Sequence, residues 1–167
     1  GLGMAQLGAM GSDQLQALTS AQLRGLSTAQ IASLATDDLN ALTSDQVATL
    51  LTAQIAALGS VQLGALASDS LAALTTQQIR AIDTRDLAGL DSADLAALSS
   101  AQVAAFTSSQ LRGLGTDDLP GLSTDAMAGL SATLIGTLAT HQLAALGSEQ
   151  WQALSSAQLR ALTTAQM

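Results

Sequence analysis

The chain has 167 residues, of which 48% are apolar but only 1% are aromatic, and it contains no cysteine. Five basic and thirteen acidic residues give a net charge of -8 at pH 7, so the surface repels phosphate and disfavours nucleic acid and anionic membranes as partners. The missing cysteines exclude disulfides and thiolate chemistry, and no apolar run reaches the roughly 18 residues of a membrane-spanning helix.

A pattern of eight residues recurs from Leu2 to Met167 without an insertion. We label its slots a to h, so that residues 20–27 (SAQLRGLS) fill the eight slots in order. Slots d and g are apolar at all 21 of their positions, and slot f always holds a small residue. Slot a is Ser or Thr at 19 of the 20 positions from Ser12 to Thr164, and slot c is Gln at 14 of 21. The unbroken register predicts one array, residues 1–167, of about 20 octads.

The period of eight argues against one long helix. Eight residues advance roughly 800° around a helix, so each apolar pair would be rotated about 80° from the previous one and no face would be buried. A coiled coil requires a repeat of about 3.5 or 3.67 residues per turn. Each octad is therefore predicted to hold one short helix over slots b to g, at 5–10, 13–18, 21–26 and so on to 157–162.

Polar and charged residues indicate where in the octad each helix begins and ends. The hydroxyl at slot a is the expected N-cap. All acidic residues lie in slots h, b and c, and four of the five arginines lie in slot e, as helix ends favour. Pro120, also at slot e, falls within the first turn, where proline is tolerated. Since slots d and g share a helix face, we predict an all-α solenoid. A β-solenoid with a corner between these slots remains the alternative.

One octad buries too little to fold alone, so the array is expected to gain stability by stacking. Two or three octads in each superhelical coil both fit, because the substitutions show no 16- or 24-residue superperiod. Gly1 to Met10 keep the pattern apart from Met4 at slot a, and Met167 occupies core slot d. We therefore expect end-to-end self-association, or excision from a longer array. The slot c glutamines are expected to form an amide ladder or to face water.

Few residues offer catalytic or metal-binding chemistry. His141 lies in a slot expected to face solvent and has no second His or Cys to share a metal. The Asp37–Asp38 and Asp117–Asp118 pairs sit where helix N-termini favour anions, and Trp151 and Phe106 occupy core slots. We predict no catalytic, cofactor-binding or metal-binding residues, no cofactor, and no enzymatic activity.

The recurrent sequences "LTSAQLRGLSTAQI" and "LSSAQLRALTTAQ" resemble the Leu/Ala/Thr/Gln-rich short octapeptide repeats of very large bacterial secreted or surface proteins of the adhesin-like kind. The resemblance implies a structural region at the bacterial surface or outside the cell. Together with the solenoid, it predicts a stalk, a spacer or a self-associating filament element. Two alternatives remain, namely an ice-binding solenoid presenting Ser/Thr rows and a protein- or glycan-binding scaffold.

Overall fold

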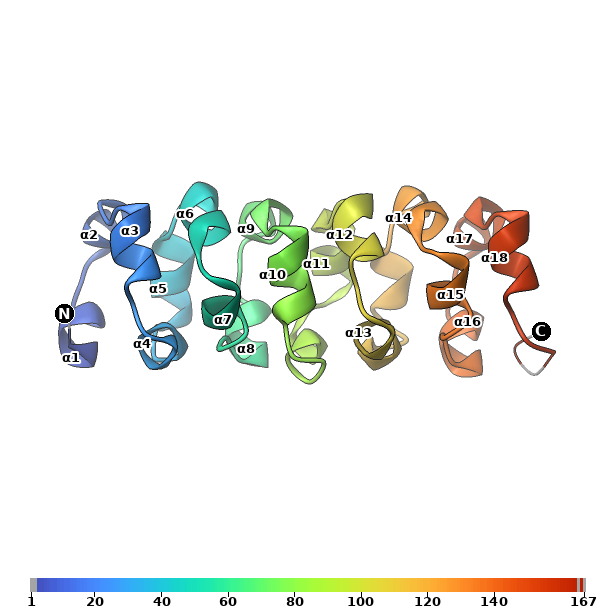
Figure 1. The fold of residues 1–167 in the computed structure, drawn as a ribbon, viewed down its shortest axis with the longest axis horizontal. Helices are drawn as coiled ribbons and strands as arrows, with labels where there is room; N and C mark the ends of the chain where they lie inside the picture. The colour runs from blue at the N-terminus through green and yellow to red at the C-terminus, as the bar shows by residue number, and fades with distance from the viewer. Residues whose placement is uncertain (1–2, 165, 167) are drawn as a thin grey trace.

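The computed structural model describes residues 3–164 and 166. Its short helices follow one another along a rod, with the two chain ends at opposite ends (Figure 1). The described residues form the α-helices α1 Met4–Leu7, α2 Ser12–Gln16, α3 Ser20–Arg24, α4 Thr28–Ala32, α5 Thr36–Ala41, α6 Ser44–Thr49, α7 Thr52–Ile55, α8 Ser60–Leu63, α9 Ser68–Ala73, α10 Thr76–Ala81, α11 Ser92–Ala97, α12 Ser100–Ala104, α13 Ser108–Gly113, α14 Thr124–Gly129, α15 Ala132–Ile135, α16 Thr140–Ala144, α17 Ser148–Ala153 and α18 Ser156–Arg160. Two 3-10 helices, η1 Asp86–Gly89 and η2 Leu119–Gly121, complete the set.

Each octad contributes one of these helices, and the described residues contain no strand. The all-α prediction is therefore confirmed, and the β-solenoid alternative is not adopted. The predicted position of the slot e arginines, near the C-terminal ends of the helices, is also confirmed. The four slot e arginines lie in the last turns of α3, α10, α13 and α18.

The N-cap lies one slot earlier than expected, because slot h caps the helix and slot a is its first residue. In α3, Thr19 has extended backbone angles, and its hydroxyl accepts the backbone N–H of Gln22 at 3.3 Å. The Gln22 side chain in turn accepts the backbone N–H of Thr19 at 2.8 Å. This reciprocal pair is a capping box, which requires Gln or Glu at the third helical position. Slot c occupies that position only when the cap is slot h, so the assignment of the cap to slot a was wrong.

The helices stack in coils of three octads. Helix α6 begins at Ser44 and packs on α9, which begins at Ser68, and α12 packs in the same way on α14. Both pairs are 24 residues apart, which is three octads. The same step relates α2 to α5 at one end and α15 to α18 at the other. Of the two coil sizes that fit the sequence, the structure has the larger.

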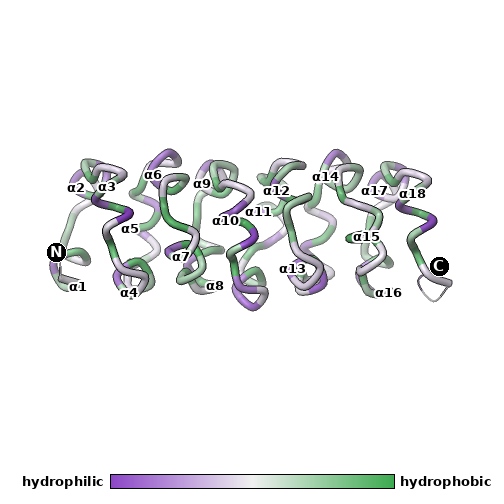
Figure 2. The backbone as a smooth tube through the Cα atoms, in the orientation of Figure 1, coloured by the Kyte–Doolittle hydropathy of each residue, from purple (hydrophilic) through white to green (hydrophobic). Residues whose placement is uncertain are grey.

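One apolar core runs the length of the rod and consists of the side chains in slots d and g. The slot d residues from Leu7 to Leu143 are at most 1% exposed, and the buried cluster extends to Leu154. Along the backbone tube, apolar stretches alternate with polar ones from end to end (Figure 2). Slots b and h mostly face solvent, so every coil has the same layout of an apolar interior and a polar rim.

Candidate functional site: glutamine clamps and the two end faces

Glutamines in slot c join octads that are far apart in the sequence. A helix leaves its last carbonyl groups without partners inside the helix. Here the Nε2 of a slot c Gln donates to the slot g carbonyl 28 residues earlier, at 2.6–3.0 Å. We call such a residue a glutamine clamp. The clamps whose two partners both lie within the described residues are Gln46, Gln54, Gln62, Gln78, Gln102, Gln110, Gln142, Gln150, Gln158 and Gln166.

Gln102 shows how one amide satisfies two helix ends. Its Oε1 accepts the backbone N–H of Ser99 at 2.8 Å, which caps its own helix α12. Its Nε2 donates to the carbonyls of Leu71 and Leu74, both at 2.8 Å, at the end of α9. The side chain is only 3% exposed. The clamp thus combines local capping with a contact between coils, and neither predicted role of the glutamines was right for these residues.

The double role also accounts for the choice of amide over acid. An ordinary capping box accepts Gln or Glu equally, because only an acceptor oxygen is needed. A clamp also needs a donor, which a carboxylate lacks. The only glutamate in the chain, Glu149, lies in the solvent-facing slot b. The frequency of Gln in slot c was the sequence signal for this site, but its partner carbonyls become apparent only in the coil.

One octad without a glutamine is held by another amide. Slot c of α9 is Ser70, which is too short to act as a clamp. Asn40, in α5, instead accepts the backbone N–H of Ala67 at 3.0 Å and donates to the carbonyl of Ala65 at 2.6 Å. An amide from a neighbouring coil therefore caps α9 where its own octad offers none.

Aspartate in slot c leaves the clamp incomplete. Asp94 accepts the backbone N–H of Asp91 at 3.1 Å, but its carboxylate cannot donate to carbonyls of an earlier coil. Partial burial raises the pKa of the Asp94 carboxyl, and the charges of Asp91 and Asp118 raise it further, against the lowering by the Asp91 N–H. Folding therefore disfavours the charged form of the Asp94 carboxyl relative to the unfolded chain.

Replacing Asp94 by Gln is expected to raise the free energy of unfolding by about 1 kcal/mol at pH 7, because the amide adds a hydrogen bond between coils. The gain should shrink in acid. The raised pKa of Asp94 lowers the stability of the folded chain by its full amount when the pH is above the folded-state pKa. The effect is absent when the pH is below the ordinary aspartate pKa of about 4. Urea unfolding at pH 7 and pH 3 measures both effects. Asp125→Gln, in solvent-facing slot b, is the matched control, and an equal gain there would contradict the clamp.

Small residues in slot f allow neighbouring coils to approach closely. A Cβ added at Gly89 or Gly121 would overlap with the backbone carbonyl of Ser60 or Ser92, respectively, in the neighbouring coil. Neither glycine has a positive φ, so the requirement for glycine there is one of space. Slot f is thus a point of close approach between coils, and among its glycines the approach is closest at the two 3-10 helices.

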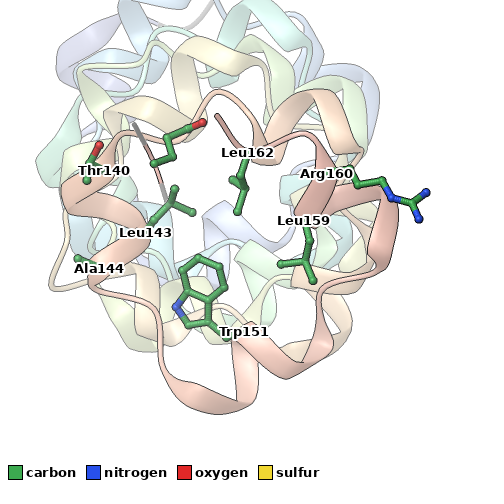
Figure 3. Close-up of a pocket in the computed structure, with 8 residues that line it drawn as sticks. Thr140, Leu143, Ala144, Trp151, Leu159, Arg160 and Leu162 are labelled. Atoms are coloured by element: carbon green, nitrogen blue, oxygen red, sulfur yellow. The ribbon is translucent and has the colours of Figure 1, made fainter. Parts of the chain in front are cut away.

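The two ends of the rod differ in what they present. At the N-terminal end, Gln6, Gln14 and Gln22 are exposed. At the C-terminal end, Leu143, Trp151, Leu159 and Leu162 point into the opening of the last coil, whereas Arg160 points away from it (Figure 3). They line an apolar hollow of about 770 Å³ that also touches Thr140, Ala144, Arg160 and Gln166. We call it the C-terminal hollow.

The residues considered for chemistry from the sequence do not come together. His141 is exposed in slot b, and Phe106 is buried in the core. Asp37 and Asp38 lie in the first turn of α5, and Asp117 and Asp118 precede η2. Within residues 3–164 and 166, no group of three or more His, Cys, Asp or Glu side chains is placed to hold a metal ion. In the same residues, no helix is both long and apolar enough to cross a membrane.

The hydroxyl rows of slot a are irregular. Residues 24 apart stack in one column, and one such column reads Thr28, Thr52, Thr76, Ser100 and Thr124. Because slot a is not the cap, the exchange of Thr for Ser reflects a first helical position that accepts either hydroxyl. Ser and Thr are mixed within these columns, so the columns do not form a uniform grid of threonine side chains.

A known repeat matches this octad. Residues 17–52, 79–116 and 135–167 match the family model described as the ALTTAQ repeat, and together they make up more than half of the chain. The chain belongs to the ALTTAQ repeat family. The letters ALTTAQ appear as residues 161–166 and fill slots f, g, h, a, b and c. The six letters of the motif correspond in order to the small slot f, the core slot g, the N-cap at slot h, two helical residues at slots a and b, and the glutamine of slot c. No curated protein matches the chain.

The ALTTAQ fold continues through residues 53–78 and 117–134, the two internal segments that the family model does not match. In residues 117–134 slot c holds Asp118, Ala126 and Leu134, so three successive octads lack the glutamine. Nevertheless, Leu119, Met127 and Leu130 remain buried, and α14 packs between α12 and α17. The core slots thus preserve the coil where these octads supply no glutamine clamp of their own, and Gln150 and Gln158 still donate to the carbonyls of Leu122 and Leu130.

Proposed function

We propose that this ALTTAQ repeat array is a rod-like spacer or stalk within a bacterial extracellular or surface protein. The observation that carries the proposal is the repetition of one interface along the chain, from α2 against α5 to α15 against α18. A spacer needs a defined length and resistance to unfolding, and both follow when each coil is held by its neighbours. About seven coils of 24 residues, stacked at roughly 8–10 Å, give a rod of roughly 60–70 Å.

The surface composition fits a spacer better than a site of chemistry. Slots b and h face solvent and carry mostly small or acidic side chains. With a net charge of -8, the rod repels nucleic acid and anionic surfaces. We propose one uninterrupted array over residues 1–167, with no reaction, cofactor or metal of its own.

Deleting residues 84–107, which are three whole octads, is expected to leave a folded rod that is one coil shorter. Both the 24-residue packing step and the 28-residue clamp step stay in register after this deletion. Small-angle X-ray scattering should show a maximum dimension shorter by roughly 8–10 Å, with an unchanged helical circular dichroism spectrum. Deleting only residues 84–95 places polar slots opposite core slots and should unfold the neighbouring coils. Similar behaviour of the two deletions would contradict the spacer.

The proposed location has a separate test. Bacteria that produce the protein carrying this array should bind an antibody against residues 3–164 without permeabilisation, and externally added protease should remove the signal. Labelling only after permeabilisation would contradict an extracellular or surface location while leaving the rod architecture intact.

A further inference from the structure

One contact between coils inside the rod has no glutamine clamps on any of its three sides. Slot c holds Asp118, Ala126 and Leu134 in three successive octads, and none of these side chains offers the amide donor of a clamp. Elsewhere between Gln6 and Gln166, no more than two successive octads lack glutamine in slot c. We call this contact, between the coil of residues 91–114 and the coil of residues 115–138, the unclamped turn.

Clamps resume on both sides of the unclamped turn. Below it, Gln102 and Gln110 hold the coil of residues 91–114 to the preceding one. Above it, Gln150 and Gln158 hold the coil of residues 115–138 to the following one. Gln142 alone reaches past the gap, because it donates to the carbonyls at the end of α13. Within the described residues, no hydrogen bond joins residues 91–114 directly to residues 115–138.

Carboxylates lie on both sides of the unclamped turn. Helix α11, with Asp91 as its cap and Asp94 in its first turn, packs against η2, which directly follows Asp117 and Asp118. The octads of α11 and η2 contain no arginine. Partial burial raises the pKa of the Asp94 carboxyl, and the charges of Asp91 and Asp118 add to this rise. Like charges thus oppose one another across a contact that already lacks its hydrogen bonds.

Packing holds the unclamped turn closed, and a short connection crosses it. The side chains of Leu119 and Met127 are fully buried or nearly so, and Gly121 lies close to the carbonyl of Ser92 in the coil below. The chain passes from one coil to the other through residues 114–118, which include Gly115 and belong to no helix. Short loop segments of this kind absorb the backbone rotation of a hinge.

We propose that the unclamped turn is a joint, at which the rod opens before any other internal turn. The coils on either side stay folded and swing about residues 114–118, where Gln142 still holds the end of α13. A spacer with one such joint bends or yields under load at a fixed place and keeps its remaining coils intact. This use of the joint rests on the proposed spacer, whereas the joint itself needs only the stacked coils.

Labelling of a buried thiol measures opening at a chosen turn, and the chain has no cysteine of its own. Val103→Cys places a thiol in α12, which packs on α14 across the unclamped turn. Val47→Cys is the matched site. Both valines occupy slot d and are at most 1% exposed, but Gln46, Gln54 and Gln62 clamp the turn at Val47. In the absence of denaturant, we expect the thiol at residue 103 to react at least about tenfold faster.

Restoring two of the missing clamps should slow the reaction at residue 103. Asp118→Gln and Leu134→Gln together supply amide donors in slot c on two sides of the joint, and the rate should fall by about tenfold. Asp118→Gln alone should give part of this effect. The matched control places the same two amides, with the same change in charge, at exposed slot b positions through Asp117→Gln and Thr133→Gln. The rate in the control should stay within about twofold.

Each outcome decides for or against the joint. Faster reaction at residue 103 than at residue 47, slowed by the restored clamps and not by the control, supports it. Equal or slower reaction at residue 103 overturns it. A rate that the restored clamps leave unchanged, or that the control lowers equally, also overturns it, because opening then does not depend on the missing clamps. The labelling rates are independent of the location of the protein, so the spacer can fail in its deletion and antibody tests while the joint stands.

Discussion

Replacing Gln102 by Glu is expected to lower the free energy of unfolding at pH 7 by roughly 3–5 kcal/mol. The buried amide donates to the carbonyls of Leu71 and Leu74, and a carboxylate in its place removes the donor and brings a negative charge toward two carbonyl oxygens. Burial would raise the pKa of this new carboxyl, so the loss should be complete above that pKa and should diminish as the pH falls below it.

Urea unfolding of the Gln102→Glu variant at pH 7 and pH 4 measures this loss. Gln77→Glu is the matched control, since Gln77 lies in the same region at exposed slot b and makes no clamp. The control should change stability by no more than about 0.5 kcal/mol. Equal losses in the two variants would mean that net charge, and not the clamp, determines the effect.

Replacing Gly121 by Ala is expected to cost about 2–3 kcal/mol of stability, because the added methyl group overlaps with the carbonyl of Ser92 in the adjoining coil. Backbone strain does not contribute, since Gly121 has a negative φ. The substitution therefore isolates the effect of the distance between η2 and α11. Thermal unfolding followed by circular dichroism is the measurement.

Gly129 provides the control within the same slot. A Cβ added there meets the Cβ of Ser100 at 3.6 Å, an ordinary van der Waals distance. Gly129→Ala should be neutral or slightly stabilising, because alanine favours the helix more than glycine does. A comparable loss at both glycines would show that overlap with the Ser92 carbonyl does not cause the loss at Gly121.

Several features of the fold are determined by each octad alone and were predictable from the sequence. Apolar residues at slots d and g fixed the core, and the acids and arginines fixed the helix direction. The N-cap was predicted one slot too late because Ser and Thr are more frequent at slot a than at slot h. The spacing of Thr19 and Gln22, a capping-box signature, was the better signal.

The remaining features depend on the superhelix. A clamp such as Gln102 finds its slot g partner, Leu74, 28 residues earlier, and nothing local marks that carbonyl. The coil number is equally hidden. Every octad meets the same surroundings in its coil, so the substitutions need not follow a 24-residue period. The sequence therefore showed that glutamine is frequent at slot c, but it did not show which carbonyl groups the glutamine side chains bind.

A disulfide between Gly129→Cys and Ser100→Cys tests most directly whether three octads form one coil. The two Cβ positions are 3.6 Å apart, close to the mean of about 3.8 Å in disulfides, and the chain has no other cysteine. Mild oxidation should join this pair rapidly, whereas Gly129→Cys with Ser108→Cys, the pair that two octads per coil would bring together, should stay reduced. Cross-linking of residues 129 and 108, with residues 129 and 100 left free, would contradict the three-octad coil.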